Sequence, residues 1–310
     1  MTTPALIALD WGTSNLRASL LDPGGRLLET RSAPGGVMAV QGGAFAAALH
    51  ALCGDWLVQF NCPLIASGMI GSRQGWKEAP YVDCPATMAQ VSAQLTAVRI
   101  DASGPASDGR TLFIVPGLRC VDDNGQFDVM RGEETQLWGA ALKPGSICVL
   151  PGTHSKWAWL GADGEISRFA TFMTGELYGL LTQHGILGRL MVFGHHHRDD
   201  FVAGARLGLT GHAQLSHTMF AARTVGLMGQ VAPAALPDYL SGILIGAEIG
   251  AATAARPGAA VCLLGDDDLC ARYALACEVA DVSTSRANAG ATTTGQWLVA
   301  RAAGLLKDLS

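Results

Sequence analysis

The chain has 310 residues, of which 49% are hydrophobic and 15% charged, and its formal net charge is −5. This composition favours a packed protein of two compact domains over a disordered chain. The acidic balance offers no basic field for nucleic acid, and the N-terminus shows no signal-peptide pattern. The longest apolar helix candidate, residues 240–255, carries Glu248 and is short for a membrane span. We therefore expect a cytoplasmic protein with neither a nucleic-acid nor a membrane partner.

The first half of the chain predicts a β-rich start followed by α/β alternation. An apolar strand at residues 6–9 leads into a small-polar turn, a second strand at residues 16–20 and a glycine turn. Residues 44–60 have helical spacing, and residues 63–66 and 111–115 are predicted strands. The long segment 68–85 is rich in Gly, Ser and aromatic residues, and loops of this length at strand ends usually bind something.

The predicted domain boundary is the break at Lys143-Pro144-Gly145, which ends a helix expected at residues 133–142. It separates an N-terminal domain, residues 1–144, from a C-terminal domain, residues 145–310. In the second domain Thr174 is expected to cap a helix. Further helices are predicted at residues 200–207, 216–228, 238–255 and 296–309, and a strand at residues 259–264. The last helix is able to pack back toward the first domain.

Cysteine and histidine spacing gives no metal motif. None of the eight cysteines forms a Cys-x-x-Cys pair and most lie in apolar runs, which predicts reduced, buried thiols. His195, His196 and His197 are adjacent and follow Gly194, which favours a solvated loop over a metal site.

One local pattern occurs twice, at residues 6–28 and 147–166: strand, small-polar turn, strand, glycine turn, strand. Gly12-Thr13 stands at the first bend and Gly152-Thr153 at the second. Such a duplicated bend can offer backbone N–H groups and hydroxyls to phosphate from two sides of a cleft. The leading hypothesis is therefore a nucleotide clamp.

Asp10 follows four apolar residues and stands at the carboxyl end of a predicted buried strand. A carboxylate there can hold hydrated Mg²⁺ against phosphate oxygens, and Asp10 is the predicted metal residue. The alternative is a plain turn that closes a hairpin. The predicted phosphate-binding residues are Gly12, Thr13, Ser14, Asn15 and Arg17 at the first bend, and Gly152, Thr153, His154, Ser155 and Lys156 at the second.

This arrangement resembles the sugar-kinase, actin and heat-shock-protein superfamily, and more closely the 2-dehydro-3-deoxygalactonokinase family. The segments that carry the closer resemblance are Ala8-Leu9-Asp10-Trp11-Gly12-Thr13-Ser14-Asn15-Leu16-Arg17, Gly68-Met69-Ile70-Gly71-Ser72, Gly75-Trp76-Lys77, Met130-Arg131-Gly132-Glu133-Glu134-Thr135-Gln136-Leu137, Leu150-Pro151-Gly152-Thr153-His154-Ser155-Lys156-Trp157, Met173-Thr174-Gly175-Glu176-Leu177 and Ser241-Gly242-Ile243-Leu244-Ile245-Gly246-Ala247-Glu248. They cover most of residues 5–275. The resemblance implies an α/β, ribonuclease H-like actin-type ATPase fold of two domains with ATP in the interdomain cleft.

The family resemblance implies ATP-dependent phosphorylation of the C6 hydroxyl of 2-dehydro-3-deoxy-D-galactonate, in galactonate breakdown, with Mg²⁺. ATP and a small sugar acid are the implied partners, and a homodimer is one open oligomeric state. A different sugar or sugar-acid kinase of the superfamily is the first alternative. A nucleotide-gated interaction ATPase is the second, although the chain has no room for a polymerisation insert or peptide-binding domain. The sequence alone does not separate galacto from gluco epimers, since a single hydrogen bond could decide.

The proton acceptor implied by the resemblance lies in Gly132-Glu133-Glu134, where related kinases carry a catalytic Asp. Glu133 is the first choice and Glu134 the second, because the alignment is ambiguous by one residue. A helix N-terminus would keep such a carboxylate ionised. The alternative is that both glutamates only favour the first helical turn.

The glycine-rich loop is the predicted sugar-acid site. Arg73 and Lys77 are its cations, and an arginine suits a planar carboxylate best. Trp76 could cover the deoxy sugar, or it could belong to the core. The predicted substrate residues are Gly68, Met69, Ser72, Arg73, Trp76 and Lys77.

For the adenosine site the sequence offers Gly265, followed by the aspartates Asp266, Asp267 and Asp268. The aspartates could face ribose hydroxyls, or cap a helix and face water. Glu248 is a further candidate for the nucleoside, and its alternative is a carboxylate on a helix surface.

Overall fold

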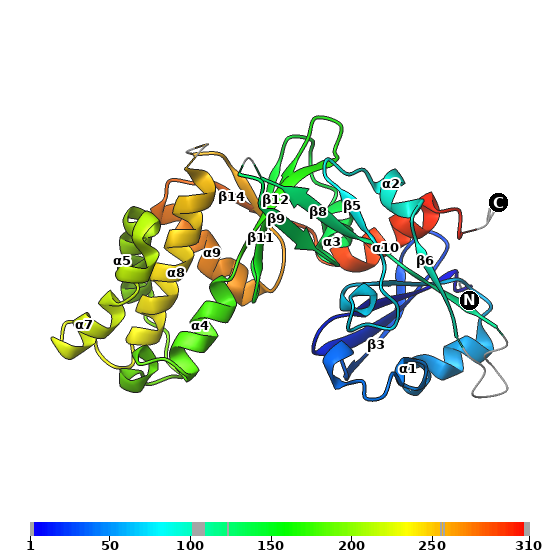
Figure 1. Cartoon of the computed structure of the whole chain (residues 1–310), viewed down its shortest axis with the longest axis horizontal. Helices are drawn as coiled ribbons and strands as arrows, with labels where there is room; N and C mark the ends of the chain where they lie inside the picture. The colour runs from blue at the N-terminus through cyan, green and yellow to red at the C-terminus, as the bar shows by residue number, and fades with distance from the viewer. Residues whose placement is uncertain (1–2, 101–108, 123, 255, 257, 307–310) are drawn as a thin grey trace. The chain divides into compact units, whose positions relative to one another are not determined.

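The computed structural model describes residues 3–100, 109–122, 124–254, 256 and 258–306 (Figure 1). The chain divides into two compact units. The first unit contains Met1–Pro144, Gly161–Arg168 and Asn288–Ser310, and the second contains Gly145–Leu160 and Phe169–Ala287. The last helix, which the sequence assigns to the second domain, therefore belongs to the first unit.

The first unit is built on a six-stranded sheet of order β3-β2-β1-β4-β7-β6. A smaller sheet has the order β5-β8-β9. The strands of this unit are β1 (Leu6–Trp11), β2 (Asn15–Leu21), β3 (Leu27–Pro34), β4 (Leu64–Ser67), β5 (Tyr81–Asp83), β6 (Thr96–Arg99), β7 (Thr111–Ile114), β8 (Gly117–Val121) and β9 (Phe127–Met130). Its helices are α1 (Phe45–Gln59), α2 (Met88–Ser92), α3 (Glu133–Gly139) and α10 (Ala291–Ala302), with 3₁₀ turns η1 (Val37–Ala39) and η2 (Met69–Gly71).

The second unit is built on a five-stranded sheet of order β12-β11-β10-β13-β14. The strands are β10 (Ile147–Leu150), β11 (Ser155–Leu160), β12 (Ile166–Phe172), β13 (Val261–Leu263) and β14 (Thr284–Arg286). The helices are α4 (Thr174–Gln183), α5 (Arg198–Gly211), α6 (Leu215–Thr218), α7 (Ala221–Leu227), α8 (Leu236–Thr253) and α9 (Asp267–Val279), with 3₁₀ turns η3 (Leu187–Leu190) and η4 (His212–Gln214).

The two sheets repeat one pattern of pairing. β1 pairs antiparallel with β2 and parallel with β4, while β10 pairs antiparallel with β11 and parallel with β13. In each sheet the hairpin turn therefore lies at the same edge as the carboxyl end of the parallel neighbour. The prediction of a mixed α/β fold with a duplicated hairpin is confirmed.

Most predicted elements occur, with two differences in the helices. Residues 216–228, predicted as one helix, form α6 and α7, and the break between them lets Met219 and Ala222 contact the same core cluster around α8. The closing helix begins at Ala291 rather than at residue 296 and ends at Ala302. The ends of two predicted helices, residue 255 and residues 307–309, lie outside the described residues.

The closing helix α10 packs against α3 in the first unit. A Cβ on Gly139 would lie 1.8 Å from the Ala291 carbonyl oxygen, and one on Gly295 would lie 1.8 Å from the Thr135 carbonyl oxygen. Glycine at both positions therefore lets the two backbones approach closely. Gln296 then reaches the main sheet, where its Nε2 donates to the Leu9 carbonyl at 2.6 Å.

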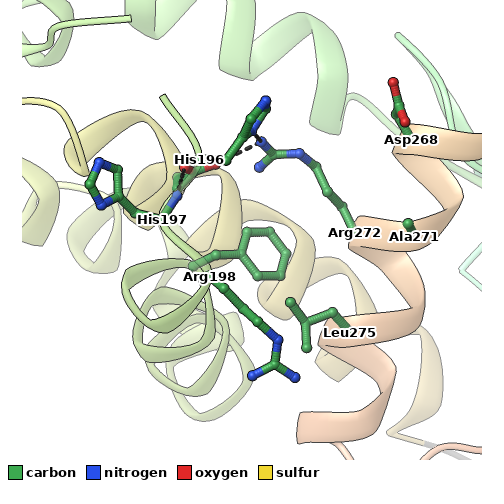
Figure 2. Close-up of a pocket in the computed structure, with 9 residues that line it drawn as sticks. His196, His197, Arg198, Asp268, Ala271, Arg272 and Leu275 are labelled. Carbon is green, nitrogen blue, oxygen red and sulfur yellow. Dashed lines mark hydrogen bonds and ion pairs between the residues drawn. The ribbon is translucent and has the colours of Figure 1, made fainter. Parts of the chain in front are cut away.

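In the second unit, Arg272 of α9 lies beside a pocket of about 350 Å³ that also contacts the start of α5 (Figure 2). Its guanidinium pairs with the buried carboxylate of Asp238 at 2.7 Å, and the second oxygen of Asp238 accepts from the His197 N–H at 2.7 Å. The guanidinium carbon lies 5.6 Å from the centre of the Phe201 ring. These contacts fix the position of Arg272 on α9.

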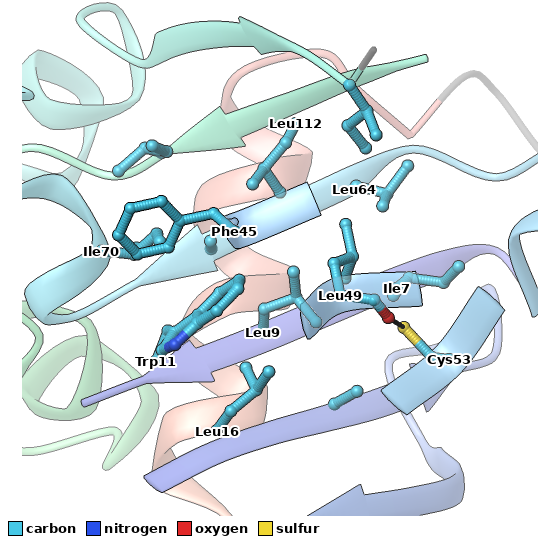
Figure 3. Close-up of a cluster of buried hydrophobic side chains, with 14 of the residues drawn as sticks. Ile7, Leu9, Trp11, Leu16, Phe45, Leu49, Cys53, Leu64, Ile70 and Leu112 are labelled. Atoms are coloured by element: carbon cyan, nitrogen blue, oxygen red, sulfur yellow. Dashed lines mark hydrogen bonds between the residues drawn. The ribbon is translucent and has the colours of Figure 1, made fainter. Parts of the chain in front are cut away.

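Each unit has its own hydrophobic core. In the first unit, side chains of β1, β2, β4 and β7 pack against α1 (Figure 3). The fully buried members include Ile7, Leu9, Leu49 and Leu64. In the second unit β10, β11 and β13 pack against α5, α8 and α9. Because these cores bury the bodies of β1 and β10, the hairpin turns that follow the two strands are held in fixed positions.

Among the described helices, none combines the length and hydrophobicity that crossing a bilayer requires. The eight cysteines are free thiols; six are buried and two are half-buried.

Candidate active site

The first hairpin turn opens on a pocket of about 600 Å³ in the first unit. The structure brings the predicted residues of the first bend together there. The lining residues are Asp10, Gly12, Thr13, Ser14, Asn15, Leu16, Arg17, Ser32, Ala33 and Pro34. The side chains of Thr13, Ser14 and Asn15 are exposed.

The turn is braced from one side by the segment that follows β3. The Ser14 carbonyl accepts from the Gly36 N–H at 3.0 Å, and the Gly12 carbonyl accepts from the Val37 N–H at 3.0 Å. With its carbonyls held in this way, the turn presents the hydroxyls of Thr13 and Ser14 to the pocket. This is the donor arrangement that a phosphate group needs.

Asp10 lies at the end of β1, opposite Arg17 in the hairpin register. Partial burial raises the pKa of Asp10; the nearby charge of Arg17 lowers it and that of Glu133 raises it again. Asp10 and Glu133 therefore lie close enough to influence each other. A second carboxylate near the turn is what binding of a divalent cation or proton transfer would use.

Two glycines bring Glu133 to the end of β1. Gly68, after β4, has φ +93°, and a Cβ there would lie 2.9 Å from the Trp11 carbonyl oxygen. Gly132, before α3, has φ +109°, and a Cβ there would lie 3.1 Å from the Gly68 Cα. Both positions therefore require glycine for conformation and for space. The ends of β1 and β4 and the start of α3 meet at this point.

Glu133 and Glu134 have different surroundings. Glu133 is half-buried, and its Oε2 accepts from the Arg131 N–H at 3.0 Å. Glu134 is fully buried, and its two oxygens accept from the Gly132 N–H at 2.7 Å and the Thr135 hydroxyl at 3.0 Å. Burial, followed by the charge of Glu133, raises the pKa of Glu134 to about 7. The geometry favours Glu133 over Glu134 as the carboxylate that meets a substrate.

The glycine-rich loop differs from the prediction in its cations. Arg73 is 83% exposed and pairs with Glu78 at 3.1 Å. Lys77 is exposed and donates to the Ala97 carbonyl at 2.9 Å, on the edge strand β6. Both cations therefore have partners of their own in this structure, and their assignment to the substrate carboxylate stays a prediction.

The other predicted substrate residues lie closer to that point. Gly68 is part of it, and Met69 belongs to the η2 turn that follows. Ser72 is buried at the end of this turn. Trp76 is half-buried and stacks on Phe45 at 6.0 Å between ring centres, so most of its surface contributes to the core.

The second hairpin turn joins β10 to β11, and Thr153 and His154 are exposed there. The His154 ring is hydrogen-bonded to the Glu176 carboxylate in the first turn of α4. The start of α4 lies directly against the turn, since a Cβ on Gly175 would be 2.5 Å from the Gly152 carbonyl oxygen. The Glu176 N–H also donates to the Thr153 carbonyl at 2.9 Å. The turn and the helix start therefore form one rigid surface.

Glu248 of α8 anchors this surface from inside the unit. It is fully buried, and each of its oxygens accepts two hydrogen bonds at 2.5–2.7 Å. The donors are the hydroxyls of Ser155, Thr174 and Tyr273 and the indole N–H of Trp157. Burial raises the pKa of Glu248, and the four hydrogen bonds oppose that shift.

This network corrects three expectations. The Ser155 hydroxyl donates to Glu248 inside the unit rather than to phosphate. Lys156 is buried, and its assignment to phosphate stays a prediction. Thr174 does not cap α4, because its hydroxyl donates to Glu248. Glu248 is neither on a surface nor positioned for a nucleoside. In the sequence, the burial of the Glu248 carboxylate was indicated by the apolar residues around it in the chain.

Gly265 has φ +149° and follows β13, close to the second turn: a Cβ there would lie 3.5 Å from the Pro151 carbonyl oxygen. Asp266 caps α9 by accepting from the Leu269 N–H at 3.1 Å. Asp267 pairs with Arg286 at 2.5 Å. The capping interpretation of the aspartates therefore fits Asp266, while Asp267 is neutralised by a partner.

A pocket of about 530 Å³ joins these parts of the second unit. Its lining combines hydroxyl-bearing and charged side chains with apolar ones. The lining residues are Pro151, Gly152, Thr153, Thr174, Gly175, Tyr178, Ser241, Leu244, Ile245, Asp266, Leu269, Arg272 and Tyr273. Apolar walls with a few placed polar groups suit a nucleoside that leads to phosphates at Gly152 and Thr153.

The histidine cluster lies apart from the second turn. His196 and His197 line the neighbouring pocket at the start of α5, which shares Arg272 but no hairpin residue with the larger pocket (Figure 2). Within the described ranges, no three His, Cys, Asp or Glu side chains are grouped as metal ligands. The expectation of a loop at His195–His197 agrees with the structure, in which α5 begins at Arg198.

The repeated sheets and hairpins define a duplicated α/β fold that other solved proteins share. The fold is shared with the activator of 2-hydroxyisocaproyl-CoA dehydratase from Clostridium difficile, at a TM-score of 0.51 and 10% identity over 100% of this chain and 98% of that one.

The chain belongs to the 2-keto-3-deoxy-galactonokinase family, whose profile matches residues 10–299. It is 39% identical over 289 residues to the 2-dehydro-3-deoxygalactonokinase of Escherichia coli (strain K12), covering 91% of this chain and 94% of that relative. A Rhizobium meliloti (strain 1021) protein named as a candidate for the same activity is 37% identical, covering 90% of each chain. The crystal structure of a candidate 2-dehydro-3-deoxygalactonokinase from Sinorhizobium meliloti matches with a TM-score of 0.85 and 33% identity, over 96% of this chain and 98% of that one.

Proposed function

We propose that this protein transfers the γ-phosphoryl group of ATP to the C6 hydroxyl of 2-dehydro-3-deoxy-D-galactonate, yielding the 6-phosphate and ADP. Family membership across residues 10–299 and identity of 37–39% to the named relatives support a carbohydrate kinase with this substrate. The observation that carries the chemistry is the approach of Glu133 to Asp10 beside the first hairpin turn.

In the first unit, Glu133 is the group we assign to accept the hydroxyl proton. Its carboxylate is half-buried and oriented by the Arg131 N–H, so it can reach a substrate without losing its position. A positioned general base of this kind contributes about 10²–10⁴-fold to a rate. Thr13 and Ser14 of the turn donate hydrogen bonds to phosphoryl oxygens in this assignment, and Arg17 adds positive charge.

Asp10 is the residue that would hold Mg²⁺. Its carboxylate lies at a strand end beside exposed hydroxyl groups, and carboxylate and hydroxyl oxygens with water are the ligands that this ion prefers. When bound, Mg²⁺ neutralises phosphate charge. Partial burial, followed by the charge of Glu133, raises the pKa of Asp10 against the opposing effect of Arg17, and a bound cation would favour the ionised form of Asp10.

In the second unit, the 530 Å³ pocket is the nucleotide site in this assignment. The base and ribose would lie between α8 and α9, and the phosphates at Gly152 and Thr153. Arg272 presents a planar cation to the base, because Asp238 fixes its guanidinium at 2.7 Å.

The test is a coupled assay of ADP release with a panel of 2-keto-3-deoxy sugar acids and plain hexoses. We expect the galactonate derivative to give the highest kcat/KM and carbon-13 NMR to place the new phosphate on C6. A hexose or a different sugar acid as the best substrate would point to another kinase of the superfamily. ADP release that no acceptor accelerates would contradict the proposal.

A further inference from the structure

The second hairpin turn carries an imidazole ring that is held at one nitrogen and open at the other. His154 is exposed, and its Nε2 is hydrogen-bonded to the carboxylate of Glu176, which is half-buried. Among the described residues, Nδ1 of the same ring has no hydrogen-bond partner. Since Nδ1 is bonded to Cγ, it lies nearer to the backbone of the turn than Nε2 does. The ring therefore connects α4 with the backbone of the turn.

The Glu176 carboxylate is held in place through the start of α4. The Glu176 N–H donates to the Thr153 carbonyl at 2.9 Å, and the close approach of Gly175 to Gly152 ties the helix to the turn. An ionised carboxylate only accepts hydrogen bonds, so the hydrogen in its bond with His154 belongs to Nε2. The contact therefore fixes which ring nitrogen carries a hydrogen.

The backbone of the same turn is suited to an anion. Within the described part of the chain, the N–H groups of Gly152, Thr153 and His154 donate to no carbonyl or side chain. Successive unpaired N–H groups in a turn form a concave site for anions such as phosphate. Gly152 and Thr153 also line the 530 Å³ pocket. A phosphate bound by this turn would meet the open side of the His154 ring.

The protonation state of the ring decides what Nδ1 offers to that phosphate. While Nε2–H donates to Glu176, the neutral ring has only a lone pair at Nδ1 and no hydrogen to donate. Phosphate oxygens are acceptors, so the neutral ring makes no hydrogen bond to them. The protonated ring donates to Glu176 and to phosphate at once, and such charge-assisted hydrogen bonds are the stronger kind.

We propose that the second turn binds a nucleotide phosphate together with a proton on Nδ1 of His154, and that Glu176 is the positioning residue that couples the two events. The proton comes from solvent and returns to it when the nucleotide leaves. Because histidine changes its charge near neutral pH, nucleotide affinity should fall as pH rises through that range. This inference rests on the proposed function, since it takes the bound anion to be a phosphate of ATP.

The other charged groups around the second turn have been compared with Glu176 as contacts of the ring. They are Lys156 of β11, Asp238 and Glu248 of α8, Asp266, Asp267, Asp268 and Arg272 of α9, and Arg286 of β14. Four of them form two ion pairs with each other, and Asp266 caps α9. Within the described ranges, Glu176 alone is hydrogen-bonded to His154.

The first test counts protons. Calorimetry of a nonhydrolysable ATP analogue at about pH 7, in buffers that differ in ionisation enthalpy, gives the number of protons taken up on binding. We expect the unsubstituted protein to take up at least about 0.3 proton more than His154→Asn, whose amide N–H stands near the position of Nδ1 and does not titrate. The titration of the analogue itself contributes to every variant and cancels in this difference. Equal uptake by the two proteins would overturn the inference.

A second variant separates positioning from a purely structural role. In Glu176→Gln the amide can donate to Nε2, so a neutral ring can carry its hydrogen on Nδ1 and bind phosphate without taking up a proton. We expect proton uptake close to that of His154→Asn, with a dissociation constant at about pH 7 within about threefold of the unsubstituted protein. A structural role would weaken binding and leave uptake unchanged, and full uptake in Glu176→Gln would show that Glu176 does not couple the two events.

The matched control is His184→Asn, because His184 is an exposed histidine at the other end of α4. It should bind the analogue and take up protons as the unsubstituted protein does. Phosphorylation of the sugar acid by a protein whose nucleotide binding takes up no His154-dependent proton would reject this inference and leave the proposed function intact. A protein that neither binds the analogue nor phosphorylates the acid would reject both.

Discussion

The two hairpin turns share one backbone plan and differ in what surrounds them. At the first turn, Asp10 and Arg17 face each other across the register, and the nearby carboxylate of Glu133 adds charge. At the second turn, the equivalent register pair is Leu150 and Lys156, and both are buried. The first turn therefore has a carboxylate at its strand end beside an open pocket, whereas the second has the apolar Leu150 at the corresponding position.

The anchoring of the two turns differs as well. The second turn is held from inside by Glu248 with four donors, and its helix start is pressed against it at Gly175. The first turn is held by backbone hydrogen bonds from the segment after β3 and by the Trp11 indole, which donates to the Gly35 carbonyl at 3.2 Å. A duplicated hairpin can thus serve two purposes: a charged turn suited to the reaction and a rigid turn suited to binding.

The largest expected effect comes from removing the base at the first turn. Glu133→Gln should lower kcat about 10³-fold, because the amide cannot accept the hydroxyl proton, while KM for ATP stays within about threefold. The coupled ADP assay measures both. Glu134→Gln is the matched control. If Glu134→Gln lost turnover while Glu133→Gln kept it, the general base would be Glu134.

The next effect tests the rigid turn. Glu248→Gln leaves an amide NH₂ facing two of the four donors, and should lower the free energy of unfolding by about 3 kcal/mol. Ser155→Ala removes a single donor and should cost about 1 kcal/mol. Urea denaturation measures both variants. A Glu248→Gln protein as stable as wild type would show that the network does not anchor the turn.

Glu134 provides a contrast with Glu248, since it is buried with fewer donors and has a pKa raised to about 7 from 4.5. A raised carboxyl pKa means that the folded state holds the proton longer than the unfolded state does. The contribution of Glu134 to stability should therefore fall by about 2–3 kcal/mol as pH rises from about 4.5 to 7. Denaturation of wild type and Glu134→Gln across this range measures the difference. An identical pH dependence in the two proteins would contradict the assignment.

The smallest effect distinguishes two glycines of α4. Gly175→Ala places a Cβ 2.5 Å from the Gly152 carbonyl oxygen, and should raise KM for ATP about fivefold by displacing the turn. Gly179→Ala has nothing within 4 Å and should leave KM unchanged. Equal KM values in the two variants would mean that close packing of α4 on the turn is not needed for nucleotide binding.

The sequence predicted the parts of the fold and site that depend on local pattern. The strands that end at Trp11 and Leu150, the glycine bends and the helix that starts at Glu133 follow from residues close together in the chain. It did not predict the Glu248 network, whose donors lie 25 to 93 residues away along the chain. It also favoured the cations nearest to the loop, Arg73 and Lys77. The sequence could not show that Lys77 donates to the Ala97 carbonyl on β6, because that contact depends on tertiary packing.

The central claim is that the first turn serves the reaction and the second turn binds the nucleotide. It is tested most directly by calorimetry of the binding of a nonhydrolysable ATP analogue without divalent ions. The variants are Asp10→Asn at the charged turn and Gly175→Ala at the rigid one. The account predicts a dissociation constant for Asp10→Asn that equals wild type or is tighter, and one for Gly175→Ala that is several times weaker. Weaker binding by Asp10→Asn together with unchanged binding by Gly175→Ala would contradict it.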